Sequence, residues 1–351
     1  MIPAVAFVSR HFRVFACLAY GVASVEWIAE ALLTDGPVAD IRAGNLTQYF
    51  VSYTEHGFAK RALVGTLLRP VLQAVPNPEL AAFCIMIAMS VAGFAALIWL
   101  VEWFLPHAEG QDMPALLRCA LAVGSAGVVQ IAHDLGRFDL LNLWLLLAAV
   151  VLVLRGTVFG AGLVIAVGIL IHEGMLIFGA PLVLALAVQL SGERMWRVAL
   201  AAVVPAMAAA AVLVWGNSDS AAALKVGSSG YVWARGVFDV RLQLPGAQVA
   251  VLAIYWAALL VLLTRCYGAS GRRADLLFLA ALCPFVMNVF GIDHGRWLTL
   301  ALMCLILNLT VQVRSGRMQW PALAGWRRGL ALVLCLPLGP HGLTGAWAWL
   351  F

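Results

Sequence analysis

Apolar runs long enough to cross a lipid bilayer recur from one end of this chain to the other. Of its 351 residues, 64% are hydrophobic and only 11% are charged, and the mean hydropathy is +0.96. A soluble domain of this size could not bury so much apolar surface. The runs approach the roughly 20 residues that a transmembrane helix needs, and they lack the alternation typical of strands. The sequence therefore predicts an all-α, polytopic helical membrane protein.

We expect a single integral membrane domain over residues 1–351, with ten or eleven transmembrane helices. Two polar stretches, residues 34–78 and 216–247, are too long to be simple turns. Within the first of them, residues 57–73 place apolar side chains at helical spacing between basic ones, which indicates a re-entrant or interfacial helix. The predicted spans lie at about 12–33, 79–105, 115–133, 140–154, 157–173, 174–190, 198–215, 248–264, 276–292 and 297–313, followed by a Pro- and Gly-broken segment at 329–351.

The positions of the basic residues predict the orientation of the chain. Arginine and lysine favour the cytoplasmic ends of spans. Alternating crossings bring most of the basic residues outside the two long loops to one side, among them Arg10, Arg13, Arg194, Arg197 and Arg265. We therefore expect a cytoplasmic amino terminus and two long periplasmic loops, in a bacterial inner membrane. The net charge of +5 reflects this topology and does not indicate nucleic acid.

A five-residue phrase occurs twice, each time at the start of a predicted span. Residues 134–138 and 293–297 share the pattern Asp-x-Gly-Arg-aromatic. A related group, His172-Glu173-Gly174, precedes another span. The three spans would point their amino-terminal ends at the periplasm, where free N–H groups and arginine side chains suit a phosphate or diphosphate. The candidate substrate-binding residues are Lys60, Arg61, Arg137, Glu173 and Arg296.

The same outer face carries acids and histidines that could take a proton from a substrate. The candidate acids are Asp40, Asp134 and Asp293, and the candidate histidines are His133, His172 and His294. Tyr231 and Trp233 in the second long loop are candidates for stacking on a sugar, or else interface aromatics.

Each of these signals has a simpler alternative that the sequence leaves open. The aspartate and arginine of each phrase could form a helix cap and a local salt bridge, and His172-Glu173 could anchor a span end. We predict no metal site, because the seven cysteines are scattered and the His/Asp/Glu spacing matches no established pattern. No cofactor is certain, and a divalent cation stays an open alternative.

In its layout and in four short segments, the chain resembles multi-pass enzymes of bacterial surface polysaccharide synthesis: the GT-C superfamily and the EpsG-like and Wzy-type polymerases. The segments are GFAKRALVGTLL, HDLGRFD, IHEG and GIDHGRW. The resemblance implies a membrane glycosyltransferase or polymerase that uses a polyprenyl (di)phosphate-linked sugar at the periplasmic face. A catalytic acid in the first outer loop would then correspond to Asp40.

The resemblance also implies the partners: a polyprenyl-linked sugar, membrane lipid, a glycan acceptor and other subunits of a polysaccharide assembly complex. Three other classes of protein fit the sequence. A secondary transporter of an anionic substrate would also have intramembrane acids and helix amino termini facing an anion. A metal-dependent membrane hydrolase or phosphotransferase would use the His-acid pairs. A noncatalytic assembly subunit is the third.

Overall fold

The computed structural model confirms the all-α, polytopic fold. It describes residues 2–33, 46–105, 111–133, 135–191, 195–216, 246–270, 275–290 and 294–336, and every regular element in these ranges is helical. Among them, four helices are long and apolar enough to cross a membrane, and a fifth span would be a pair bent by 86° between Arg10 and Phe12. Shorter apolar helices occupy other predicted spans. The four long helices are Pro78–Phe104, Asp112–Ala132, Met195–Trp215 and Gly295–Arg314.

Contacts between residues divide the chain into two compact units, which we describe one at a time. The first unit comprises Met1–Trp27, Phe94–His133 and Arg235–Phe351, and the second comprises Ile28–Gly93 and Asp134–Ala234. Helices α2 (Phe12–Leu33) and α6 (Pro78–Phe104) each contribute to both units.

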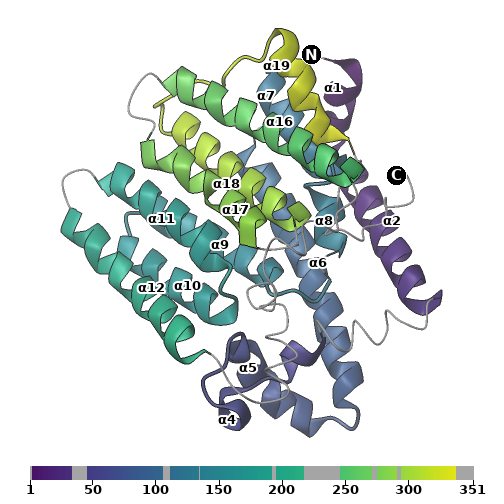
Figure 1. The fold of residues 1–351 in the computed structure, drawn as a ribbon, viewed down its shortest axis with the longest axis vertical. Coiled ribbons are helices and arrows are strands. Elements are labelled where there is room, and N and C mark those ends of the chain that lie inside the picture. Colours follow the sequence, from purple (N-terminus) through teal and green to yellow (C-terminus); the bar gives the residue numbers. More distant parts are fainter. Residues whose placement is uncertain are drawn as a thin grey trace. The chain divides into compact units, whose positions relative to one another are not determined.

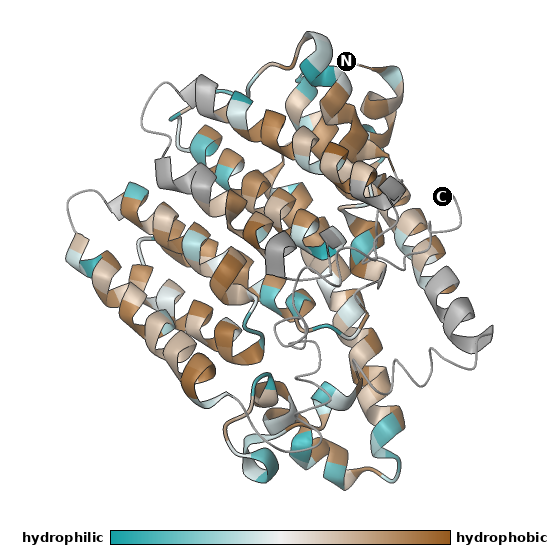
Figure 2. Ribbon diagram, viewed as in Figure 1, coloured by the Kyte–Doolittle hydropathy of each residue, from teal (hydrophilic) through white to brown (hydrophobic). Residues whose placement is uncertain are grey.

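Four consecutive helices form the body of the second unit. They pack on one another through links of a few residues, which favour antiparallel neighbours (Figure 1). A Cβ atom at Gly162 would lie 2.3 Å from the Ala201 carbonyl oxygen, so two of the helices touch backbone to backbone. Figure 2 shows apolar residues along these helices and hydrophilic ones mainly near their ends. The helices are α9 (Asp139–Leu154), α10 (Val158–Ile171), α11 (Met175–Ser191) and α12 (Met195–Trp215).

The amphipathic helix predicted at 57–73 is present in the second unit as α5 (Ala62–Ala74). It rests on the short helix η2 (Thr47–Tyr49) and also packs against α10. A Cβ atom at Gly65 would lie 2.1 Å from the Val51 carbonyl oxygen, so α5 lies directly on the backbone that follows η2. The described part of the predicted loop at 34–78 is therefore packed together.

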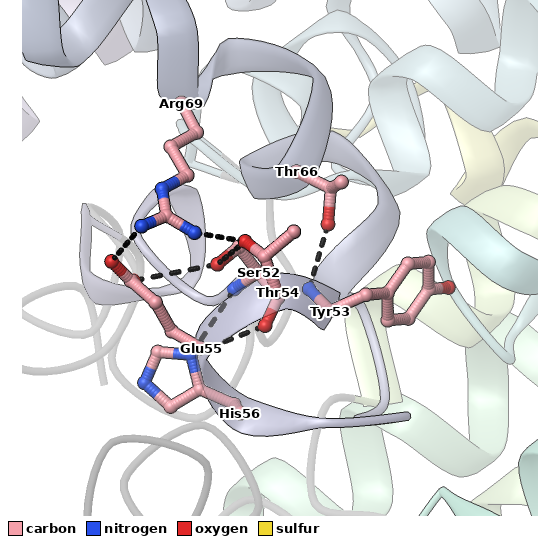
Figure 3. Close-up of polar contacts among 7 residues, drawn as sticks. All are labelled: Ser52, Tyr53, Thr54, Glu55, His56, Thr66 and Arg69. Atoms are coloured by element: carbon pink, nitrogen blue, oxygen red, sulfur yellow. Dashed lines mark hydrogen bonds and ion pairs between the residues drawn. The ribbon is translucent and has the colours of Figure 1, made fainter.

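A polar network joins α5 to the one-turn helix α4 (Tyr53–His56), as Figure 3 shows. The Tyr53 N–H donates to Thr66 Oγ1 at 2.8 Å. Arg69 donates to Thr54 and pairs with Glu55 at 2.8 Å. The Glu55 side chain is 46% exposed, so this ion pair lies at the surface.

In the first unit, α18 (His294–Arg314) is largely buried and contacts α8 (Val128–His133), α16 (Gly246–Ser270) and α17 (Asp275–Phe290). The predicted span at 115–133 is one apolar stretch with a break between α7 and α8. A Cβ atom at Gly124 would lie 2.0 Å from the Leu334 carbonyl oxygen, so no larger residue fits there. The other helices of this unit are α1 (Pro3–Arg10), α7 (Asp112–Val123), α8 (Val128–His133), α16 (Gly246–Ser270), α17 (Asp275–Phe290), α19 (Gly325–Leu332) and the turn η4 (Val333–Cys335).

A buried arginine ties together three segments of the first unit. Arg118 of α7 donates to the carbonyl oxygens of Ser9 at 3.2 Å and Leu105 at 2.9 Å. It also donates to Glu102 at 3.1 Å, and its guanidinium lies 5.1 Å from the centre of the Phe12 ring. Arg118 therefore connects the bend between α1 and α2 to the end of α6.

Candidate functional site

Six polar side chains of the second unit gather where α5, α9 and α11 begin. We call this group the polar cluster. One member precedes α5, three come from the end of the phrase at 134–138 and the first turn of α9, and two come from the link between α10 and α11. The positive end of each helix dipole lies at this point. The members are Arg61, Arg137, Asp139, Asn142, His172 and Glu173.

Arg61 and Glu173 form a two-point ion pair across 112 residues of chain. Arg61 Nε donates to Glu173 Oε2 at 3.2 Å, and Arg61 Nη2 donates to Glu173 Oε1 at 2.7 Å. Burial alone would raise the pKa of Glu173, but the charges of Arg61 and His172 and the bond from Arg61 hold it well below its usual range. The pair is therefore fully ionised near neutral pH.

The backbone at Arg61 is in the left-handed region, with φ of 64°. Among the described residues it is the only one other than glycine with a positive φ. Such a conformation is costly for a side chain of this size, and it is typical of positions where surrounding contacts hold a functional group in place. Here the ion pair with Glu173 provides that contact.

Asp139 and His172 form a second, more deeply buried pair. His172 Nδ1 lies 3.4 Å from Asp139 Oδ1, and the two side chains are only 3% and 4% exposed. The Gly174 N–H also lies 3.0 Å from this Nδ1. The carboxyl and imidazole groups are therefore close enough to exchange a proton.

Asn142 extends the cluster by one helical turn from Asp139. It is fully buried, and its Nδ2 donates to the His172 carbonyl oxygen at 3.2 Å, which fixes the link between α10 and α11. Its Oδ1 is buried as well and has no hydrogen-bond partner among the described residues. A buried amide oxygen favours a nearby donor, such as a hydroxyl or water.

The first copy of the repeated phrase forms a turn that is stabilised by residues far away in the sequence. Gly136 has φ of 82°, which favours glycine. Its carbonyl oxygen accepts from Gln48 Nε2 at 2.6 Å and Tyr49 OH at 3.1 Å, and Phe138 packs edge-on to Tyr49 at 5.1 Å. The glycine and the aromatic residue therefore place Arg137 directly before α9.

The second copy has a different backbone and lies in the first unit. Gly295 and Arg296 are inside the first turn of α18, which begins at His294. Arg296 is 6% exposed, and its guanidinium lies 4.5 Å from the centre of the Trp297 ring. The two phrases share residue types and a position at the start of a helix, but they differ in backbone conformation.

The structure brings together four of the predicted site residues: Arg61, Arg137, His172 and Glu173. Lys60 precedes Arg61, and the backbone N–H of Lys60 donates to the Gly216 carbonyl oxygen at 3.2 Å. His133 ends α8 and His294 begins α18, both in the first unit together with Arg296. Asp40, Asp134, Tyr231, Trp233 and Asp293 lie outside the described residues, so their roles stay predictions.

Four polar residues of this region were missed by sequence reasoning as site residues: Gln48, Tyr49, Asp139 and Asn142. For two of them a signal exists, because Asp139 and Asn142 stand three residues apart on one face of an otherwise apolar span, where polar groups are costly. Within the described ranges, no three His, Cys, Asp or Glu side chains are grouped so as to hold a metal ion.

The comparisons with known proteins identify no relative of this chain. It matches no family, no curated protein and no solved structure.

Replacing Gly136 by alanine tests whether the turn before α9 positions Arg137. Because φ at this residue is 82°, a side chain there costs about 1–2 kcal/mol of stability. We expect a lower free energy of unfolding in detergent and a displaced Arg137. Gly156→Ala is the control, since this glycine also has a positive φ, of 79°, but lies at the opposite end of α9. Equal stability of Gly136→Ala and the wild type would contradict the prediction.

The pH dependence of stability tests the Arg61–Glu173 pair. The folded-state pKa of Glu173 is depressed, so the pair stabilises the folded protein above the ordinary glutamate pKa of about 4.3. That contribution is lost only as pH falls below this value toward the depressed one. We expect the stability difference between wild type and Glu173→Gln to stay constant from pH 8 to pH 5 and to shrink below about pH 4. A decrease already between pH 7 and pH 5 would show that the pKa is not depressed.

Proposed function

We propose that this membrane protein is a glycosyltransferase or polysaccharide polymerase of the bacterial inner membrane. Its donor would be a sugar linked to a polyprenyl (di)phosphate, bound at the periplasmic face. The observation that carries the proposal is the polar cluster. There a buried Asp–His pair lies beside arginines at the amino-terminal ends of apolar helices.

The arginines supply what the leaving group of such a reaction needs. As the bond between the sugar carbon and the phosphate oxygen breaks, negative charge grows on the phosphate. Arg61 and Arg137, supported by Lys60 and by the positive dipole ends of α5 and α9, would stabilise that charge. Arg61 and Arg137 lie close enough for their charges to oppose each other, which favours an anion beside them.

The Asp139–His172 pair supplies the base. The acceptor hydroxyl oxygen forms the new bond to the sugar carbon and gives up its proton to this pair, while the polyprenyl (di)phosphate leaves with the bonding electrons. Asn142 Oδ1 offers a further acceptor for the hydroxyl as it approaches. The membrane-embedded helices would keep the lipid tail of the donor beside the cluster.

A proton-coupled secondary transporter of an anion is the second candidate. The low exposure of Asp139 and His172, 4% and 3%, favours it, because a buried carboxylate that exchanges a proton is typical of such transporters. The two candidates differ in one respect: a transferase consumes a lipid-linked sugar, whereas a transporter moves its substrate unchanged.

The test is a cell-surface polysaccharide profile of Arg137→Ala and Arg296→Ala variants, each at wild-type membrane expression. Loss of long-chain glycan with accumulation of a lipid-linked precursor in Arg137→Ala would support the proposal. The same result in Arg296→Ala would assign both phrases to one reaction. Arg69→Ala is the matched control, because Arg69 pairs with Glu55 at the surface of the same unit. Unchanged glycans in Arg137→Ala, together with lost uptake of an anion, would favour the transporter.

A further inference from the structure

We infer that the Glu173 carboxylate occupies the binding position of a substrate phosphate group on Arg61, and that the phosphate displaces it on binding. The inference deepens the proposed function and rests on it only for the identity of the ligand as a polyprenyl (di)phosphate. What it adds is the exchange at Arg61 and the role of Glu173 as an internal competitor.

The geometry of the pair is that of anion recognition. Two N–H groups of one guanidinium edge donate to the two oxygens of one carboxylate, at 3.2 and 2.7 Å. Two oxygens of a phosphate accept from a guanidinium in the same way. A phosphate that reaches Arg61 therefore competes for the donors that Glu173 now uses.

The exposure of the two partners decides which one can move. The Arg61 side chain is 16% exposed, and its backbone is fixed in the left-handed region at the start of α5. The Glu173 side chain is 35% exposed and comes from the short link between α10 and α11. Glu173 is thus the partner that can turn away, while Arg61 stays in place to receive the ligand.

Charge favours the exchange. Glu173 brings one negative charge to the cluster, whereas the diphosphate of a diphosphate-linked donor brings more. Arg137 lies close enough to oppose the charge of Arg61, and the charges of Asp139 and His172 are opposite in sign. Replacing the carboxylate by a dianion would therefore neutralise both arginines.

The experiment measures binding to the purified full-length chain in detergent, with inorganic diphosphate and a polyprenyl phosphate as separate probes. Glu173→Gln removes the competing charge, so we expect it to bind both probes about tenfold more tightly than wild type, equivalent to about 1.4 kcal/mol. Glu173→Asp keeps the charge, but its shorter side chain weakens the two-point contact with Arg61. Its affinity for each probe should therefore lie between those of the wild type and Glu173→Gln. Phosphatidylglycerol micelles serve as a third arm, and equal tightening there would assign the site to lipid headgroups in general.

Two controls separate the exchange from a change in overall charge or fold. Glu55→Gln removes a carboxylate from the surface pair with Arg69 in the same unit and should leave both affinities unchanged. Arg61→Gly relieves the left-handed backbone and removes the guanidinium, so it should fold and lose binding.

Unchanged or weaker binding by Glu173→Gln, with the variant folded, would overturn the inference and leave the pair a purely structural contact. Failure of the proposed function is a distinct result. In that case the variants would show the expected order of phosphate affinities, while membranes containing the wild-type protein would transfer no sugar from a lipid-linked donor.

Discussion

Asp139→Asn is expected to lower the rate of glycosyl transfer in isolated membranes by about 100-fold or more, in the range typical of losing a positioned acid–base group. The substitution keeps the shape of the side chain but removes its ability to ionise. His172 Nδ1 would then face an amide that cannot accept a proton. The measurement is the initial rate of product formation from a lipid-linked sugar at equal amounts of membrane protein.

A second variant separates this chemical role from a structural one. His172→Gln should reduce the rate by a similar factor, and the double variant should be no slower than either single one, because the two residues act as a unit. Asp112→Asn is the matched control, since it changes an aspartate that pairs with Arg328 in the first unit. Retention of more than about a tenth of the wild-type rate in Asp139→Asn would remove the pair from the mechanism.

Arg118→Ala is expected to destabilise the folded protein by about 2–5 kcal/mol, because a buried carbonyl group that loses its hydrogen-bond donor costs about 1–3 kcal/mol. The substitution leaves the carbonyl oxygens of Ser9 and Leu105 without their donor and Glu102 without its closest cation. The bend between α1 and α2 loses its connection to α6 at the same time. The measurement is the free energy of unfolding by denaturant in detergent micelles.

Arg13→Ala provides an internal comparison for this prediction. Arg13 pairs with the same Glu102, at 3.4 Å, but its side chain is 71% exposed. Surface pairs contribute at most about 1 kcal/mol, so the variant should be close to wild type. Similar effects of the two substitutions would show that burial does not determine the importance of Arg118.

Local patterns in the sequence were sufficient for the all-α fold and for most of the helices. The apolar runs predict spans that agree with α9, α10, α11 and α12 to within a few residues. The spacing of apolar residues in 57–73 likewise predicts α5, although the helix begins at Ala62, one residue after Arg61. Such predictions succeed because hydropathy and helical periodicity depend on neighbouring residues.

The repeated phrase shows what local sequence patterns cannot predict. Its residue types correctly indicate the start of a helix in both copies, since Asp139 begins α9 and His294 begins α18. They do not predict that Gly136 adopts a left-handed turn while Gly295 lies inside a helix. That difference depends on Gln48 and Tyr49, which bind the Gly136 carbonyl oxygen from 88 and 87 residues away.

Hydropathy along the chain predicts a helical membrane protein with charged residues at the ends of its spans, because polar groups are costly in lipid. The contacts of Arg61 with Glu173 and of Asp139 with His172 become visible only in the folded protein. These pairs depend on which helices pack together and on how each is rotated. No local pattern encodes either property, since the free energy of packing is shared among side chains far apart along the chain.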